Sequence, residues 1–291
     1  MGEPLPVCFL NGEFLPLREA RISPLDRGFL YSDGAYEVTP VYGGRPFRFD
    51  QHHDRLARSL KEIRMDDPLA RAAWRDVYRE LLARNGHSGD LYIYVQVTRG
   101  AEFGRNHAPL PDVPRTVFAF ASPWPTGRAG WQDNGLPAIT AADTRWARCD
   151  IKSVSLLANV LLRQLAVDEN ASETILLRDG LLTDASASSV HVVVGGELRT
   201  PPNSWKLLPG TTRGVIEEVA LKAGVQWRST PVTEAQLRGA DEIVMGAATR
   251  EVQPVTTLDG KPVGSGKPGP VWRKLFDAFQ AYKREVANQP W

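Results

Sequence analysis

The feature that most constrains the fold is a break in the middle of the chain. Residues 122–130 contain two prolines and two glycines, which interrupt helices and strands. Patterns typical of strands and helices lie on both sides of this segment, so it is predicted to be a linker. At 291 residues the chain is long enough for two medium domains. We therefore predict a domain over residues 1–121, a linker over 122–130 and a second domain over 131–291.

The first domain is predicted to place two helices between two groups of strands. Asp50 is expected to cap the first helix, because an aspartate side chain can accept from the free N–H groups of a first turn. Asn85-Gly86 is expected to end the second helix, since glycine readily adopts the left-handed conformation of a helix end. The predicted strands cover 6–17, 35–49, 91–98 and 116–121, and the helices run from Asp50 through Ile63 and over 70–84. This order is typical of an α+β domain.

Strand and helix patterns resume after the linker. Strands are predicted over 138–142, 174–177, 190–194 and 242–245, and helices over 155–167, 212–223 and 271–286. Together the two halves predict a two-domain protein of the α+β or α/β class.

Composition and charge narrow the function classes. The 35 basic and 34 acidic residues nearly balance, which gives no indication of a nucleic-acid partner. No apolar run long enough for a signal peptide or membrane anchor occurs in the first thirty residues, where Glu3, Asn11 and Arg18 interrupt it. A cytoplasmic protein is therefore predicted, with no membrane partner. Cys8 and Cys149 are far apart, so neither a disulfide framework nor a thiolate metal site is expected.

Three other chemistries lack a convincing motif. The sequence contains no G-x-S-x-G nucleophile elbow. His52 and His53 are adjacent on a predicted helix, where neighbouring side chains point about 100° apart, so they are poorly placed to share a metal. We expect these histidines on a solvated helix face and predict no metal site. The glycine-rich run from Gly264 to Pro268 departs from the P-loop pattern, because Lys261 stands at a glycine position and proline follows the lysine.

Several residues suit a phosphorylated aldehyde cofactor. Pyridoxal phosphate enzymes combine a Schiff-base lysine, a phosphate site, an acid at the pyridine nitrogen and a wall for the ring. Gly210-Thr211-Thr212-Arg213 precedes a helical pattern and can offer N–H groups and hydroxyls to a phosphate. Arg55 offers a planar fork donor for the same group. Lys152 lies close to Ile151 and Val154, and partial desolvation there favours imine formation. On chemistry alone, each has a structural alternative: the threonines as an ordinary helix N-cap, Arg55 as a surface arginine and Lys152 as an exposed lysine.

Four groups of motifs occur in the order and at the spacing of a known family. They are Asp26-Arg27-Gly28, Asp33-Gly34-Ala35-Tyr36-Glu37 and Asp54-Arg55-Leu56; Gln96-Val97-Thr98-Arg99-Gly100 and Arg105-Asn106-His107; Arg145-Trp146, Asp150-Ile151-Lys152-Ser153 and Leu156-Leu157; and Leu182-Thr183-Asp184-Ala185-Ser186, Leu208-Pro209-Gly210-Thr211-Thr212-Arg213 and Ala247-Ala248-Thr249-Arg250-Glu251-Val252. On these residues the chain resembles the fold-type IV pyridoxal phosphate aminotransferases, most closely the bacterial D-amino acid transaminases. The resemblance covers essentially the whole chain. It implies a small N-terminal α+β domain and a larger C-terminal domain, with the cofactor at their interface.

The resemblance also implies which residues bind the cofactor. Lys152 corresponds to the Schiff-base lysine, which then carries a proton between the substrate Cα and the cofactor. Asp184 stands where the family places the acid that keeps the pyridine nitrogen protonated. The phosphate ligands correspond to Arg55, Thr211 and Thr212, and the residue packed against the ring corresponds to Leu208.

Two residues depart from the family pattern. Asp184 replaces the usual glutamate and is one methylene shorter, so its contact with the pyridine nitrogen is expected to be longer or water-bridged. Ala248 replaces a phosphate-binding threonine, which leaves only its backbone N–H for that duty. Both changes predict looser cofactor retention or a slower half-reaction.

The resemblance implies a substrate site on a loop from Gly100 to Asp112. In D-amino acid transaminases an R-x-H pair on this loop, here Arg105 and His107, reaches from the neighbouring subunit. With a tyrosine, here Tyr36, the pair binds the substrate α-carboxylate, for which cationic donors are suited. Thr249 is a further expected substrate contact. Because the loop acts on the neighbouring subunit, the resemblance implies an obligate homodimer. Relative to the family, this chain has one extra residue between Gly100 and Arg105.

The implied reaction converts a D-amino acid and a 2-oxo acid into a new pair by a ping-pong mechanism. Typical substrates are D-alanine, D-glutamate, pyruvate and 2-oxoglutarate. Alternatives on the same fold are a branched-chain L-amino acid aminotransferase, an (R)-amine transaminase and 4-amino-4-deoxychorismate lyase. A pyridoxal phosphate binding protein without catalysis is a further alternative, because Asp184 and Ala248 depart from the family pattern.

Overall fold

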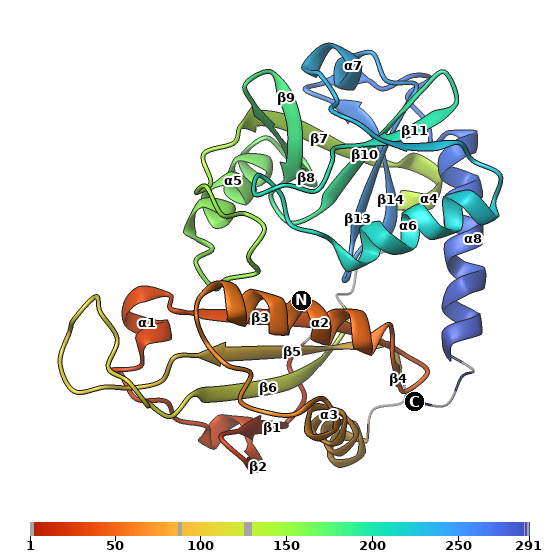
Figure 1. Ribbon diagram of the computed structural model, residues 1–291. Coiled ribbons are helices and arrows are strands. Elements are labelled where there is room, and N and C mark those ends of the chain that lie inside the picture. The colour runs from red at the N-terminus through yellow and green to blue at the C-terminus, as the bar shows by residue number, and fades with distance from the viewer. Residues whose placement is uncertain (1–2, 87–88, 125–129, 288, 290) are drawn as a thin grey trace. The chain divides into compact units, whose positions relative to one another are not determined.

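The chain divides into two compact units (Figure 1). The computed structural model describes residues 3–86, 89–124, 130–287, 289 and 291. Unit 1 comprises Met1–Thr126, Ile151–Ser155 and Val286–Trp291, and unit 2 comprises Gly127–Asp150 and Leu156–Glu285. Residues 125–129 of the predicted linker lie outside the described residues. The domain boundaries given above therefore stay a prediction.

Unit 1 is built on a six-stranded antiparallel sheet in the order β2-β1-β6-β5-β3-β4. Its strands are β1 (Val7–Leu10), β2 (Glu13–Pro16), β3 (Gly34–Tyr42), β4 (Arg45–Pro46), β5 (Leu91–Thr98) and β6 (Thr116–Pro123). Its helices are η1 (Leu17–Glu19), α1 (Arg27–Tyr31), α2 (Phe49–Glu62) and α3 (Arg71–Asn85). The predicted order of strands, two helices and strands is confirmed.

Two helices bury one face of this sheet. Leu91, Ile93, Val95 and Val97 alternate along β5 and join one core cluster with side chains of α2 and α3. Burying each such side chain stabilises the fold by about 1.5–3 kcal/mol. Tyr94, between two of these residues, points to the opposite face, where its ring stacks on another tyrosine at 5.6 Å.

The start of α2 differs from the prediction. Arg48, in the left-handed conformation with φ 56°, is the N-cap, so Asp50 lies inside the first turn and caps nothing. The Asp50 carboxylate instead accepts hydrogen bonds from Arg75 at 2.7 Å and Arg71 at 3.1 Å. An acidic side chain in a first turn also interacts favourably with the helix dipole, which explains why the residue type suggested a cap. The predicted end of α3 is confirmed, since Gly86 is left-handed with φ 58°.

Unit 2 contains a nine-stranded mixed sheet in the order β12-β11-β10-β13-β14-β7-β8-β9, with β15 paired to β14. Its strands are β7 (Leu136–Ala142), β8 (Glu173–Arg178), β9 (Leu181–Ala185), β10 (Ser189–Val194), β11 (Glu197–Thr200), β12 (Trp227–Ser229), β13 (Glu242–Ala247), β14 (Glu251–Leu258) and β15 (Lys261–Pro262). Its helices are α4 (Trp131–Asn134), α5 (Leu157–Asp168), α6 (Thr211–Lys222), α7 (Glu234–Arg238) and α8 (Pro270–Ala287).

The predicted strands and the three long helices of unit 2 are confirmed, whereas β9, β11, β12, β14 and β15 were not predicted. Pro254 lies inside β14, and proline disfavours a strand interior because it has no N–H to donate. The strand nevertheless forms, paired to β13 on one side and β7 on the other. Within the residues described above, no helix is long and apolar enough to cross a membrane.

Candidate active site

Lys152 lies in a short segment that extends the outer edge of β3. The Tyr36 N–H donates to the Lys152 carbonyl at 3.0 Å, and the Val154 N–H donates to the Gly34 carbonyl at 3.0 Å. The Lys152 N–H donates to Ser59 Oγ of α2 at 3.2 Å. Backbone hydrogen bonds therefore fix this segment, and none of them uses the lysine side chain.

Gly34, whose carbonyl accepts from Val154, packs closely against β5 on its other side. A Cβ added there would lie 2.6 Å from the Val97 carbonyl oxygen, which is backbone and cannot move aside. The neighbouring Tyr36 presents its ring to the lysine, with Nζ 4.2 Å from the ring centroid. Such a distance is within the range of a cation–π contact.

Arg55 lies one helical turn before Ser59 on α2 and is held by a buried carboxylate. Its Nε and Nη2 donate to the two oxygens of Glu37 at 2.9 and 2.6 Å. His52 Nδ1 lies 2.9 Å from the same carboxylate. Glu37 is 1% exposed, and a buried carboxylate without such partners would be strongly destabilising.

Burial and pairing set the protonation states of Glu37 and His52. Burial opposes ionisation of Glu37, but Arg55 and His52 together outweigh it and hold the pKa of Glu37 well below its usual range. Burial lowers the pKa of His52, so the imidazole is neutral at pH 7 and donates from Nδ1. His52 is 2% exposed, so our expectation of a solvated face was wrong for this residue.

Asp184 lies in unit 2 beside an arginine. Its Oδ2 accepts from Arg145 Nη1 at 3.2 Å and lies 3.5 Å from the Leu208 N–H. Arg145 is also bound by Asp143, with two contacts of 2.9 and 3.0 Å. Burial raises the pKa of Asp184 to about 6, although the charge and hydrogen bond of Arg145 oppose this shift. The structure therefore brings together Asp184 and the backbone of Leu208, two of the residues predicted for the cofactor.

The first turn of α6 offers an anion site. Gly210, its N-cap, is extended, and no side chain of the described residues caps the helix. The free N–H groups of this 12-residue helix can therefore meet a phosphate, together with the hydroxyls of Thr211 and Thr212. The turn that contains Ala248 and Thr249 begins beside this helix.

The chain passes close to α6 at Gly246, just before that turn. A Cβ at Gly246 would lie 2.5 Å from Ile216 Cδ1 and 3.5 Å from Thr212 Cγ2. After this glycine the chain reverses, and the Arg250 N–H donates to the Ala247 carbonyl at 3.0 Å. Ala248, predicted to contribute only its backbone, thus belongs to a tight turn that follows Gly246.

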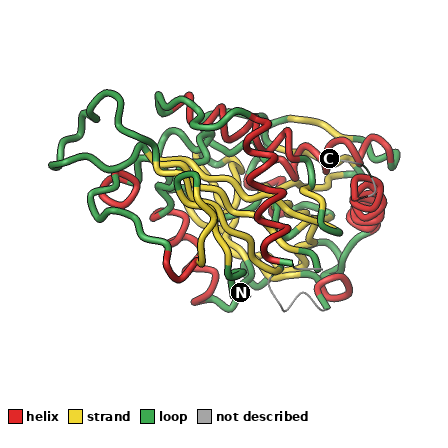
Figure 2. The backbone as a smooth tube through the Cα atoms, turned by 90° about the horizontal axis from the view of Figure 1, so that it is seen from below, coloured by secondary structure: helices red, strands yellow, loops and turns green. Residues whose placement is uncertain are grey.

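Arg105 and His107 lie on the loop that projects from the strand ends of unit 1, drawn in yellow in Figure 1 and seen again in Figure 2. Both side chains are exposed. The Arg105 guanidinium lies 5.0 Å from the Tyr31 ring centroid, and the His107 ring lies 5.5 Å from it. The loop therefore presents two nitrogen-bearing side chains around one aromatic ring.

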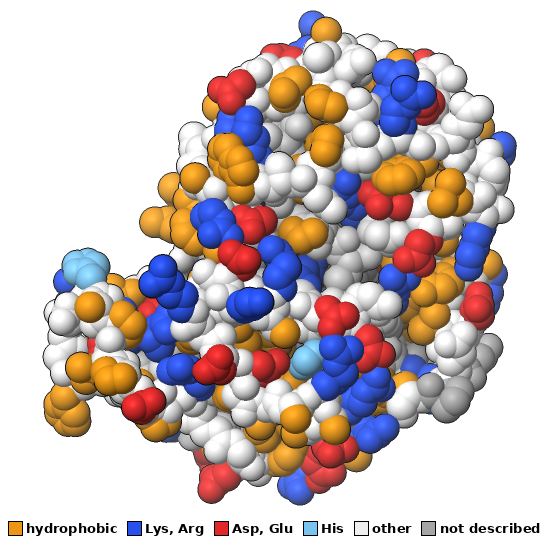
Figure 3. Space-filling view, in the orientation of Figure 1, with side chains coloured by type: hydrophobic (Ala, Val, Ile, Leu, Met, Phe, Trp, Pro, Cys, Tyr) orange, Lys and Arg blue, Asp and Glu red, His pale blue; other side chains and the backbone are white. Residues whose placement is uncertain are grey.

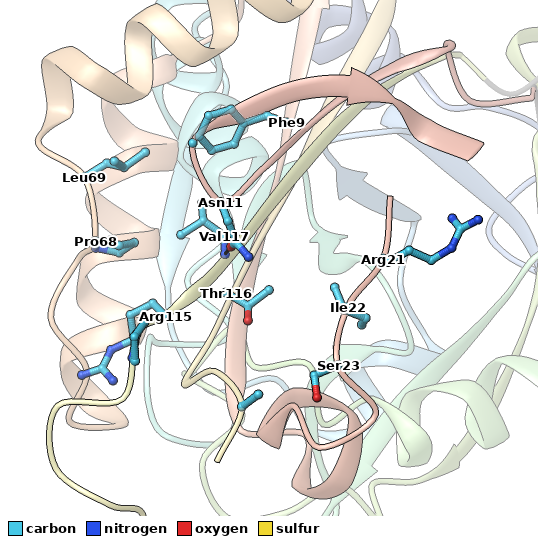
Figure 4. Close-up of a pocket in the computed structure, with 13 residues that line it drawn as sticks. Phe9, Asn11, Arg21, Ile22, Ser23, Pro68, Leu69, Arg115, Thr116 and Val117 are labelled. Carbon is cyan, nitrogen blue, oxygen red and sulfur yellow. Dashed lines mark hydrogen bonds between the residues drawn. The ribbon is translucent and has the colours of Figure 1, made fainter. Parts of the chain in front are cut away.

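A surface cavity of about 550 Å³ lies elsewhere in unit 1. Figure 4 shows the 13 residues that line it, and none of them is a predicted site residue. Its arginines, Arg21 and Arg115, lie on opposite sides with their guanidinium groups directed outward. No charged group of the lining thus points into the cavity, and we assign it no chemistry.

The sequence did not indicate the role of three residues close to the predicted site. Glu37 and His52 hold Arg55, and Arg145 holds Asp184. The alternation of buried and less buried residues along β3 could have indicated the role of Glu37. It turns the carboxylate toward the core, where a buried charge needs a partner. Nothing local identifies Arg145 as the partner of Asp184, since 39 residues separate them.

Comparison with known proteins gives a consistent result. Residues 34–258 match the family described as Amino-transferase class IV. The D-alanine aminotransferase of Staphylococcus haemolyticus is 39% identical over 276 residues, 94% of this chain and 96% of that protein. The Bacillus licheniformis D-alanine aminotransferase is 37% identical over 270 residues, 93% of this chain and 94% of that protein.

Solved structures show the same fold. A T.th. branched-chain amino acid aminotransferase with pyridoxamine 5'-phosphate superposes with a TM-score of 0.88 at 28% identity, covering 97% of this chain and 95% of that one. The Escherichia coli branched-chain amino acid aminotransferase gives a TM-score of 0.90 at 24% identity, covering 99% and 97%.

Proposed function

Because the chain belongs to the class IV aminotransferases, we propose that it transfers amino groups between D-amino acids and 2-oxo acids, with pyridoxal 5'-phosphate as its cofactor. The observation that carries this proposal is the near-full-length identity to D-alanine aminotransferases, at 37–39% in the relatives described above. The proposed substrates are D-alanine, D-glutamate, pyruvate and 2-oxoglutarate. A cytoplasmic location is part of the same proposal.

The residues present fit this cofactor. When bound, pyridoxal phosphate supplies an electron sink for negative charge on the substrate Cα. Lys152 would hold it through Nζ and, once released, move a proton from the substrate Cα. Arg55 and the uncapped first turn of α6 would bind the phosphate. Asp184, buried and acidic, would accept the N–H of the pyridine ring.

The proposed substrate contacts are Tyr36, Arg105, His107 and Thr249. Arg105 and His107 place two nitrogen donors on one loop, which suits a carboxylate. The planar guanidinium of Arg105 can bind both carboxylate oxygens. Whether the enzyme accepts D- or L-amino acids is tested directly by comparing the two in the half-reaction.

The test is to mix the pyridoxal-loaded enzyme with single amino donors and follow the absorbance of the bound pyridoxal form as it converts to the pyridoxamine form. We expect rapid conversion with D-alanine and D-glutamate and none with L-leucine or L-glutamate. Arg105→Gln should raise the KM for D-alanine about tenfold or more, because a charge-assisted carboxylate contact is lost. Conversion with L-leucine instead would identify a branched-chain enzyme, and no conversion with any donor would contradict the proposed activity.

We also propose that the protein forms a homodimer in which the loop acts on the neighbouring site. One face of α5 exposes apolar side chains at helical spacing: Leu157, Val160, Leu161 and Leu165, which are 73%, 60%, 61% and 44% exposed. Hydrophobic side chains lie on the surface over this helix (Figure 3). On the loop itself, Phe103 is 98% exposed. Such apolar surfaces are typical of an interface between chains.

Leu161→Asp is expected to shift the protein from dimer to monomer, since a charge at the centre of the α5 face is costly to bury. The mass is measured by size-exclusion chromatography with light scattering. Glu169→Lys, just after the end of this helix, controls for a change of charge alone. A monomeric wild type, or a Leu161→Asp variant that stays dimeric, would contradict an interface at α5.

A further inference from the structure

Arg27 is a buried arginine whose contacts converge on the loop that carries Arg105 and His107. Its side chain is 3% exposed. Nη1 donates to Glu102 Oε1 at 2.5 Å and to the Asn106 carbonyl at 2.6 Å, and Nη2 donates to the His107 carbonyl at 2.9 Å. Nε donates to Asp33 at 2.9 Å. One guanidinium therefore binds two consecutive carbonyls of the loop and two carboxylates.

Glu102 connects Arg27 to the far part of the loop. While one carboxylate oxygen accepts from Arg27, the other accepts the Leu110 N–H at 2.9 Å. The Glu102 side chain is 4% exposed, unlike the exposed loop residues that follow it. The carboxylate thus joins the loop at Glu102 to the loop at Leu110, and Arg105 and His107 lie between these two residues.

The start of the loop is also fixed. The Arg27 N–H donates to the Gly100 carbonyl at 2.8 Å. Gly100 has φ +99°, and a Cβ there would lie 1.9 Å from the Pro114 carbonyl oxygen, so only glycine fits. Both ends of the loop are therefore anchored beside Arg27.

The same arginine also contacts the ring that lies under the exposed pair. Arg27 lies 4.5 Å from the Tyr31 ring centroid, and Arg105 lies 5.0 Å from it. The His107 ring packs against Tyr31 at 5.5 Å. Arg27 thus contacts the backbone of His107 directly and shares an aromatic neighbour with both side chains.

We infer that Arg27 and Glu102 form a clamp that sets the conformation of the loop and so positions Arg105 and His107 to bind a substrate carboxylate. The inference rests on the proposed function, because it assumes that these two residues meet the substrate. Arg27, in α1, and Glu102, near the start of the loop, are positioning residues: both side chains are buried and act through the backbone of the loop.

The charges of the clamp are set by its own contacts. The Leu110 N–H and Arg27 hold the pKa of Glu102 below its usual range. Burial opposes ionisation of Asp33, but hydrogen bonds from Arg99 and Arg27 lower its pKa overall. Both carboxylates are therefore ionised at neutral pH, where each forms an ion pair with Arg27.

The test compares Arg27→Lys and Glu102→Gln with Arg115→Lys in the holoenzyme. Lysine keeps the charge, but a single ammonium cannot span two carbonyls and two carboxylates. Arg115 is the matched control because it also binds backbone carbonyls, those of Arg99 and Val113 on either side of the loop, without touching the segment between Glu102 and Leu110. We measure kcat and KM for D-alanine and the hydrogen exchange of the Leu110 amide.

We expect both clamp variants to raise the KM for D-alanine about tenfold with kcat within about threefold of wild type, since the carboxylate contact is weakened but the proton transfer at Lys152 is untouched. The Leu110 amide should exchange faster in both variants. Arg115→Lys should leave kcat, KM and exchange unchanged. A KM change without faster exchange, or faster exchange without a KM change, would overturn the clamp.

Arg105→Gln separates this inference from the proposed function. If Arg105→Gln raises the KM and the clamp variants do not, the clamp is wrong and the proposed substrate site stands. If Arg105→Gln leaves the KM unchanged, the proposed substrate site itself fails. Glu102→Gln keeps the test decisive if the buried Arg27→Lys variant does not fold, because glutamine retains the size of the side chain and one acceptor.

Discussion

Replacement of Lys152 by alanine is expected to lower the rate of transamination with D-alanine by about 10⁴-fold or more and to leave the fold intact. Losing a positioned general base alone costs about 10²–10⁴ in rate, and losing the covalent attachment adds to that. The fold should survive because the hydrogen bonds of this segment come from the backbone, to Tyr36 and Ser59. An alanine keeps all of them.

The Lys152→Ala experiment uses single-turnover kinetics with D-alanine and the absorbance of the bound cofactor. Added pyridoxal phosphate should give the spectrum of the free aldehyde, because no amine remains to bind it covalently. Lys61→Ala, an exposed lysine in the last turn of α2, controls for the loss of a positive charge and should react at the wild-type rate. A Lys152→Ala rate above about 1% of wild type would exclude Lys152 as the base.

The backbone of unit 1 was predictable because its signals are local. The strand over 91–98 and the helix end at Gly86 each depend on a few neighbouring residues, and both were confirmed. The N-cap of α2 was not predictable, since Arg48 is an unusual cap and Asp50 has the preferred residue type. Salt bridges to α3, twenty or more residues away, use the Asp50 carboxylate instead.

The side-chain networks at the site lay beyond sequence reasoning. Lys152 and Arg55 were candidates from their chemistry and Asp184 from the family resemblance, and the roles of all three stay predictions. Their partners are set by tertiary contacts: Glu37 reaches Arg55 across 18 residues. The pairing of Arg27 with Glu102 spans 75 residues, and no periodicity encodes it. Residue type and spacing therefore identified candidates, whereas the structure was needed to show what holds them.

Replacement of Asp184 by asparagine is expected to lower kcat by about 10²-fold or more. Asparagine has almost the same size, but it carries no charge to hold a proton on the pyridine nitrogen. A preorganised charged or hydrogen-bonding group of this kind contributes about 10²–10³ to the rate. Rapid mixing with D-alanine measures the half-reaction directly, and a wild-type rate in Asp184→Asn would show that the shorter carboxylate has no such role.

The same substitution is expected to stabilise the apoprotein as the pH rises. In the unfolded chain Asp184 ionises near the ordinary aspartate value of 3.8, whereas burial raises the folded pKa to about 6. Between these values the unfolded state loses its proton first, so wild-type stability falls with rising pH and stays lower above about pH 6. Asparagine does not titrate. The stability of Asp184→Asn relative to wild type should therefore grow by about 1–1.5 kcal/mol between pH 5 and pH 8.

Asp143→Asn is the matched control, because Asp143 binds the same arginine with the opposite pKa shift. Burial opposes its ionisation, but hydrogen bonds from Arg145 lower the pKa of Asp143 overall. Its stabilising effect is therefore complete above its unfolded pKa and is lost as the pH falls through the folded value, so Asp143→Asn should destabilise the apoprotein uniformly between pH 5 and pH 8. Urea unfolding of both variants across this range measures the difference. A pH-independent effect of Asp184→Asn would mean that Asp184 is fully ionised in the folded apoprotein, and that its carboxylate does not need the cofactor to hold its charge.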